Sequence, residues 1–177
     1  MVQLTPMAQA DYALWLENIV REYAEEHITG GKWTREEALQ ESAKEIGSLL
    51  PDGPSTRDNY LFSVINEHGE KVGHLWFAVR GSETNRHAFV FDFAVHEPYR
   101  RRGYGREAFL ALENEVKALG LDNIRLHVFG HNTPARDLYK QLGYVETNVN
   151  MRKDLGSASI AVPQSKPATS PEAPVHD

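Results

Sequence analysis

The chain contains 177 residues, and its 19 lysines and arginines are outnumbered by 25 aspartates and glutamates, which gives a formal net charge of −6. Hydrophobic residues make up 41% of the chain and charged residues 25%, as in an ordinary globular protein with a buried core. The length favours one domain. The absence of cysteine excludes disulfide scaffolds, thiolate metal sites and cysteine nucleophiles.

The composition also bears on partners and location. No apolar stretch approaches the ~18 residues of a membrane span, and the N-terminus lacks the basic and then apolar order of a signal peptide. We therefore expect a soluble, cytoplasmic protein with no membrane partner. The net negative charge argues against nucleic-acid binding and mildly favours small cationic partners.

A short strand is expected at residues 2–5, followed by a helix whose buried stripe contains Leu16, Ile19, Val20 and Tyr23. Thr34 and Glu37 have the spacing of a capping box, which predicts a second helix that ends at Leu49. Residues 51–54, Pro-Asp-Gly-Pro, then break the chain. Three strands are expected after this break, at residues 61–65, 72–79 and 88–95.

The second half of the folded part is predicted to begin with a helix from about residue 105 to residue 119. A strand at residues 124–128, a short helix at 134–142 and one or two final strands between 144 and 153 follow. Because a strand–helix–strand unit spans residues 88–128, its two strands should be parallel, with a right-handed crossover. The expected fold class is α/β or α+β, built on a mixed sheet.

The C-terminal segment differs in composition from the rest. It is rich in serine, alanine and threonine, and it contains Pro163, Pro167, Pro171 and Pro174. Such a segment cannot bury enough apolar surface to offset the entropy lost on ordering. We predict a single folded domain over residues 1–155 and a disordered Pro/Ser/Ala-rich tail over residues 156–177.

The segment after the strand at 88–95 carries the first chemical signal, Arg-Arg-Arg-Gly-Tyr-Gly-Arg at residues 100–106. Glycine permits positive φ and leaves the backbone amides uncovered, and amides at a helix N-terminus form an anion site that suits a pyrophosphate. No Gly-Lys-Ser/Thr follows, as a Walker loop requires, and no third glycine stands three positions after Gly105. The alternative is a glycine turn beside a solvated basic cluster.

A second motif follows one strand later. Taken together, the two motifs resemble the GCN5-related N-acetyltransferases, the GNAT family: Arg100-x-x-Gly103-x-Gly105 and Asn132-x-x-Ala135-x-x-Leu138-Tyr139-x-x-x-Gly143-Tyr144. The likeness is strongest over residues 89–144 and extends loosely over residues 1–155. The sequence looks most like bacterial members of the family.

The resemblance implies a GNAT-type fold, a mixed central sheet flanked by helices and splayed open between the strands at 88–95 and 124–128. Acetyl-CoA would be the cosubstrate, with its pantetheine arm at Val95 and its pyrophosphate on the amides of residues 101–106. The cofactor-binding residues that the resemblance implies are Ala94, Val95, Arg100, Arg101, Arg102, Gly103, Tyr104, Gly105, Arg106, Asn132, Ala135 and Tyr139. No metal site is expected.

The implied reaction is direct acetyl transfer, in a ternary complex, to a primary amine of a small molecule or peptide. An amine with a pKa of ~10.4 is mostly protonated at pH 7, so a base or a chain of waters must help to free its lone pair. Tyr139 is expected to give a proton to the departing thiolate, with core packing as its alternative role. The alternative function is a catalytically idle acyl-CoA-binding regulatory module, and since family members often form dimers, a homodimer is allowed for.

The base has several candidates. Asp92 is the carboxylate within residues 89–95, and strand alternation places it on the face opposite Phe89, Phe91 and Phe93. It could act as the base, anchor the fold or contact the acceptor. His127 is a second candidate, although a lone histidine in a strand is more often structural, and water is a third. Asn132 either contacts the cofactor or belongs to the turn, in which Thr133 is the expected N-cap before Pro134.

Acidic and aromatic side chains of the N-terminal half are candidates for an acceptor pocket. In the family this segment usually builds the acceptor site, while the alternatives are a solvated helical face for the acids and core packing for the tryptophans. These candidates are Glu17, Glu22, Glu25 and Glu26, together with Trp15, Trp33 and Trp76.

Overall fold

The computed structural model describes residues 1–151 and 153, and in this part of the chain the strands form one mixed sheet in the order β1-β2-β3-β4-β5. The first four strands pair antiparallel, and β5 runs parallel to β4 as predicted. The strands are β1 (Gln3–Pro6), β2 (Asn59–Ile65), β3 (Lys71–Arg80), β4 (His87–Val95) and β5 (Ile124–Leu126).

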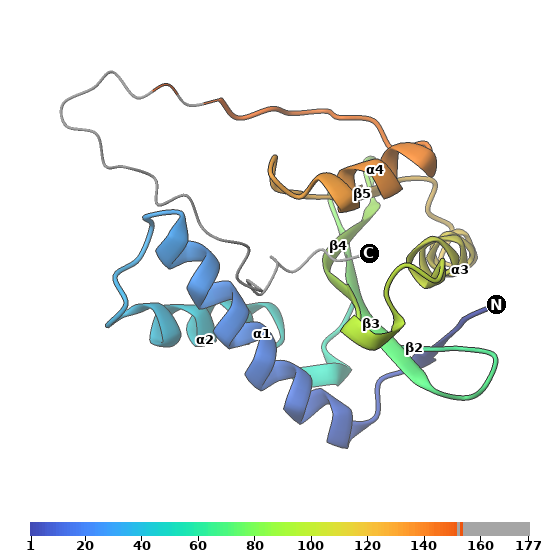
Figure 1. Cartoon of the computed structure of the whole chain (residues 1–177), viewed down its shortest axis with the longest axis horizontal. Helices are drawn as coiled ribbons and strands as arrows, with labels where there is room; N and C mark the ends of the chain where they lie inside the picture. Colours follow the sequence, from blue (N-terminus) through green and yellow to red (C-terminus); the bar gives the residue numbers. More distant parts are fainter. Residues whose placement is uncertain (152, 154–177) are drawn as a thin grey trace.

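Helices lie on both faces of this sheet (Figure 1). They are α1 (Gln9–Thr29), α2 (Ala38–Leu49), α3 (Tyr104–Ala118) and α4 (Thr133–Gln141). One core packs α3 and α4 against the sheet, for example Phe109 and Tyr139 with Phe93. A second core packs α1 and α2 against the other face and contains Trp15 and Trp76. This arrangement confirms the predicted α/β class with a central sheet flanked by helices.

The predicted final strands are wrong for the described part of their segment, since residues 144–151 and 153 belong to no helix or strand. Tyr144 still packs against the core, but Val145, Val149 and Met151 are 80%, 69% and 92% exposed, so the residues after Tyr144 bury no apolar face that would favour a strand. The predicted tail, residues 156–177, and the predicted domain end at Leu155 lie outside the described residues.

A β-bulge in β4 changes the face of Asp92. Trp76 of β3 pairs with Asp92, but the next β3 residue pairs with Val90, so Phe91 is an extra residue in β4. Phe91 stacks on Trp76 with ring centroids 4.6 Å apart, while Val90 and Phe93 enter the core with α3. The prediction that Asp92 lies opposite Phe91 is therefore wrong, because the bulge interrupts the alternation, whereas Phe93 does lie on the opposite face.

The pairing between β4 and β5 covers only the start of β4. It joins Ala88 to Ile124 and ends with Val90 beside Leu126, although β4 continues to Val95. The two strands thus part in the region where the splayed GNAT-type sheet was expected to open. The second half of β4 and the turn after it are the elements that position the candidate site.

Candidate active site

The turn from β4 to α3 has a backbone suited to an anion. Gly103 is the N-cap of α3 with φ of +86°, and Arg101 has φ of +60°, which is uncommon for a residue with a side chain. An added Cβ at Gly103 would meet nothing within 4 Å, so the space beside the helix start is open. The first N–H groups of α3 have no acceptor within the helix and lie at its positive end. Gly105, by contrast, lies buried inside the first turn of α3.

A cavity of about 280 Å³ opens at this turn, and we call it the loop cavity. It brings together most of the predicted pyrophosphate residues, while Arg102 lies outside its described lining with its guanidinium 5.7 Å from the centre of the Tyr99 ring. The described lining residues are Val95, Tyr99, Arg100, Arg101, Gly103, Tyr104, Gly105, Arg106, Leu138 and Gln141.

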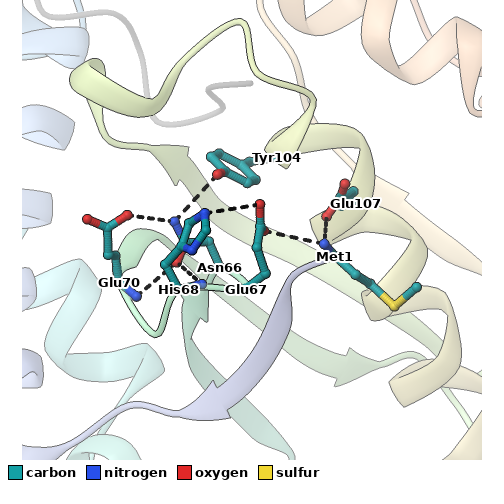
Figure 2. A network of polar contacts seen from close by, with 7 residues as sticks. All are labelled: Met1, Asn66, Glu67, His68, Glu70, Tyr104 and Glu107. Carbon is teal, nitrogen blue, oxygen red and sulfur yellow. Dashed lines mark hydrogen bonds and ion pairs between the residues drawn. The ribbon is translucent and has the colours of Figure 1, made fainter.

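A polar network fixes the start of α3 from the side of the β2–β3 turn (Figure 2). The buried Asn66 donates to the Tyr104 hydroxyl at 3.4 Å and to Glu70 at 2.8 Å, and its carbonyl oxygen accepts from the backbone N–H groups of His68 and Glu70. The exposed N-terminal ammonium of Met1 adds contacts to Glu67 and to the half-buried Glu107, and ion pairs of an exposed group contribute little stability. The loop that lines the cavity is thus held by a buried side-chain amide.

A second cavity, of about 230 Å³, lies between α1 and the sheet, and we call it the α1 cavity. It shares Val95 and Arg100 with the loop cavity, so the two cavities meet at the end of β4. Arg100 holds this strand end, since its Nε donates to the Val95 carbonyl at 3.0 Å. Its lining includes two cations, Lys71 and Arg100, and four carboxylates, Asp11, Glu22, Asp92 and Glu97.

Asp92 lies at the base of the α1 cavity with 1% of its surface exposed. Its Oδ2 accepts a hydrogen bond from Nε1 of Trp15 at 2.7 Å and lies 3.0 Å from Nε2 of His74. The β3–β4 register explains the second contact. It pairs Trp76 with Asp92, and His74 lies two residues before Trp76 in β3, on the same face of the sheet. Sequence reasoning missed His74, whose signal lies only in this long-range register.

The charges around His74 act against each other. Burial alone lowers the pKa of His74, but the Asp92 carboxylate, its hydrogen bond and the more distant Glu22 together raise it above its ordinary value. His96 lies beside it, with ring centroids 5.9 Å apart, and burial together with the charge of His74 lowers the pKa of His96. The pKa values of the two neighbouring histidines are therefore shifted in opposite directions.

The acidic residues of α1 separate into two groups. Glu22 lines the α1 cavity, and burial and the Asp92 charge raise its pKa. Burial, followed by repulsion from the carboxylates of Glu22 and Asp92, raises the pKa of Glu26 to about 8. Glu17 and Glu25 instead form exposed ion pairs with arginines, as expected for a solvated face. Trp15 and Trp76 are core residues, and Trp15 also lines the α1 cavity. Trp33 instead packs its ring edge-on against Tyr23.

The second sequence motif lies in α4 and the turn before it. Asn132 is the N-cap, with its side-chain oxygen accepting from the Ala135 N–H at 3.2 Å, so the prediction that Thr133 caps the helix is wrong. An N-cap side chain lies over the first turn of the helix that follows it, so the Asn132 oxygen can accept from this amide. Tyr139 is 3% exposed, with its ring 5.1 Å from Phe109, and it is not among the described residues that line either cavity.

Three further predictions can be placed. Ala94 lines the α1 cavity rather than the loop cavity, and Ala135 is buried in the core with α3. His127 contacts the ring of Phe129, with centroids 5.0 Å apart, and is not a described lining residue of the α1 cavity.

Within the described residues, no group of His, Asp and Glu is placed to hold a metal ion. None of the helices in this part of the chain is long and apolar enough to cross a membrane.

Comparison with known proteins agrees with this geometry. A sequence model described as the acetyltransferase (GNAT) family matches residues 16–144. The uncharacterized N-acetyltransferase YycN of Bacillus subtilis is 37% identical over 87% of this chain and 99% of its own length. YdgE of the same organism, with the same description, is 32% identical over 86% of this chain and 97% of its own length.

Structural comparison gives the same result. The crystal structure of YycN superposes with a TM-score of 0.81 and covers 89% of this chain and 100% of the YycN chain, at 36% identity. The family match covers more than half of the sequence, and the relatives align over almost their whole lengths. This chain therefore belongs to the acetyltransferase (GNAT) family.

Proposed function

We propose that this protein transfers the acetyl group of acetyl-CoA to a primary amine of a small molecule or peptide, by direct transfer in a ternary complex. The observation that carries the proposal is that the arginine-lined loop cavity meets the α1 cavity, which holds several carboxylates, at Val95 and Arg100. The loop cavity offers cations and helix N–H groups, which suit a pyrophosphate. The α1 cavity offers carboxylates, which suit a cationic amine.

In the proposed complex, acetyl-CoA binds in the loop cavity, whose residues have the chemistry that this cosubstrate requires. The amides of residues 101–106, with the arginines beside them, would bind the pyrophosphate. Backbone groups at Ala94 and Val95 would bind the pantetheine arm and polarise the thioester carbonyl, because a strand-end amide can stabilise an oxyanion. When bound, acetyl-CoA supplies an activated acyl group with a thiolate leaving group. Asn132 would contact the cofactor arm, whereas the buried Ala135 would only support the helix start that Asn132 caps.

An acetyl-cysteine intermediate is excluded because the sequence has no cysteine, which supports direct transfer. The amine nitrogen would form its bond to the carbonyl carbon while the bond to sulfur breaks. Tyr139 would give a proton to the departing thiolate, since a phenol O–H is a hydrogen-bond and proton donor. A cytoplasmic location and a homodimer remain predictions.

Release of the CoA thiol with a panel of amines tests the proposal. The panel should include monoamines, diamines, amino sugars and short peptides, and a thiol-reactive dye can report release directly because the protein contributes no thiol. Titration calorimetry measures acetyl-CoA binding in parallel. Binding without transfer to any amine would favour the idle acyl-CoA-binding module, and absence of binding would refute both functions.

A further inference from the structure

We infer that His74 is the base that takes the proton from the acceptor amine, with Asp92 as the positioning residue that fixes its tautomer. This inference rests on the proposed function and reassigns Asp92, which the sequence had suggested as the catalytic carboxylate. His74 lines the α1 cavity with 21% of its side chain exposed, whereas only 2% of the Asp92 side chain is exposed. Of the two groups, His74 is the one that an amine in the cavity can contact.

The short contact between the two side chains decides which ring nitrogen is basic. Nε2 of His74 lies 3.0 Å from Oδ2 of Asp92, so a neutral imidazole carries its hydrogen on Nε2 and donates it to the carboxylate. The lone pair is then on Nδ1. The Trp15 N–H fixes the same carboxylate oxygen at 2.7 Å, which keeps the acceptor of this hydrogen bond in place.

The position of His74 along the sheet matches the proposed chemistry. In the β3–β4 register, His74 pairs with Ala94, and the neighbouring Gly73 pairs with Val95, where the two cavities meet. An added Cβ at Gly73 would lie 2.2 Å from the Ala94 carbonyl oxygen, so only glycine permits this close approach of β3 to β4. The imidazole is thereby beside the strand end at which the thioester is proposed to lie.

The proposed reaction begins with a proton transfer to His74. Nδ1 of neutral His74 accepts one proton from the substrate ammonium, and the freed nitrogen lone pair forms the bond to the carbonyl carbon. The bond between carbon and sulfur breaks with its electron pair on sulfur, and the Tyr139 hydroxyl gives its proton to the thiolate. The remaining excess proton of the nitrogen restores the Tyr139 hydroxyl, and the imidazolium releases its proton to solvent. Amide, CoA thiol and one proton are the products.

Other charged groups face the same cavity and set the pH at which His74 loses its proton. Asp92 and Glu22 favour the imidazolium, while Lys71 opposes it. Asp11 pairs with Lys71, which offsets both charges. The charged and titratable groups around the cavity, from α1, β3, β4 and the following turn, are Asp11, Glu22, Lys71, Asp92, His96, Glu97 and Arg100.

The dependence of kcat/KM on pH tests the inference. We expect an acid limb with an apparent pKa above 6.5 in the natural protein, and its loss in His74→Gln together with a fall in kcat/KM of about 10²–10⁴-fold. Asp92→Asn should shift this limb to lower pH, because the carboxylate that favours the imidazolium is gone. Free imidazole should restore part of the activity of His74→Ala, which a merely structural role would not explain.

Matched histidine variants and a spectroscopic readout complete the test. His68→Gln changes an exposed histidine of the β2–β3 turn and should leave the profile unchanged. An acid limb that disappears in His96→Gln but persists in His74→Gln would overturn the inference. Nitrogen NMR of the labelled full chain should show the Nε2–H tautomer at His74, and an Nδ1–H tautomer would also overturn it. Absence of transfer by the natural protein would refute the proposed function itself.

Discussion

Alanine substitutions at the two glycines that flank α3 separate backbone strain from loss of cofactor binding. Gly103 precedes the helix with φ of +86°, and Gly120 follows it with φ of +72°. At both positions an added Cβ would meet nothing within 4 Å. The cost of each alanine is therefore that of an L residue in the left-handed region, about 1–2 kcal/mol. In a domain of this size, that cost lowers Tm by about 2–8 °C.

Only Gly103→Ala is expected to weaken acetyl-CoA binding, because Gly103 lines the loop cavity and Gly120 does not belong to its described lining. A methyl group at Gly103 would stand beside the first N–H groups of α3. Loss of one hydrogen bond to a charged phosphate costs about 1.5–3 kcal/mol, which corresponds to an increase in Kd of about 10–150-fold. Titration calorimetry gives Kd, and differential scanning calorimetry gives Tm.

The pair of variants makes the reasoning refutable at each step. Equal changes in Kd for Gly103→Ala and Gly120→Ala would show that the loop cavity does not bind the pyrophosphate. A Kd of Gly103→Ala for acetyl-CoA equal to that of the natural protein would show the same. A Tm loss far larger in Gly103→Ala than in Gly120→Ala would contradict the open space beside Gly103.

Three other variants test the remaining parts of the site. Trp15→Phe should lower the free energy of unfolding by about 2 kcal/mol in urea titrations, because Asp92 loses a hydrogen-bond donor; an unchanged midpoint would contradict this. Tyr139→Phe keeps the packing against Phe109 and should lower kcat about tenfold or more, with the Kd for acetyl-CoA unchanged. If the kcat of this variant equals that of the natural protein, Tyr139 has only a packing role. Because the pKa of Glu26 is raised from 4.5 to about 8, the folded state holds a proton that the unfolded state loses in this window, and stability should fall as pH rises through it. Glu26→Gln should reduce that fall, and an identical slope in both proteins would contradict the assignment.

Much of the fold could be predicted because the signals are local. Apolar spacing located α1, and the glycine at residue 103 predicted the positive φ that the N-cap of α3 adopts. The capping-box spacing of Thr34 and Glu37 predicted α2, but the helix begins at Ala38 with Glu37 as its N-cap. Arg101 also has positive φ, but nothing in its chemistry favours that conformation, so only the closed turn reveals it. The cap of α4 was misplaced by one residue, because Asn132 and Thr133 are both good N-caps and only the geometry separates them.

The candidate site was harder to predict because it depends on register. The glycine and arginine loop is contiguous in sequence, so most of its members were found together in one cavity. His74 and Asp92 are brought together by pairing between β3 and β4, and Trp15 reaches the same carboxylate from α1. No local pattern marks such a contact, since each residue is separately consistent with a buried structural role.

The bulge at Phe91 links the fold to the chemistry. In an uninterrupted strand, the alternation that puts Val90 in the core with α3 would put Asp92 there as well. A carboxylate in that apolar core would lack the Trp15 and His74 partners, and burying it unpaired would be strongly destabilising. The extra residue turns Asp92 to the α1 face while Phe93 returns to the core with α3. The same local irregularity therefore completes the apolar core on one face and sets the hydrogen-bonded carboxylate under His74 on the other.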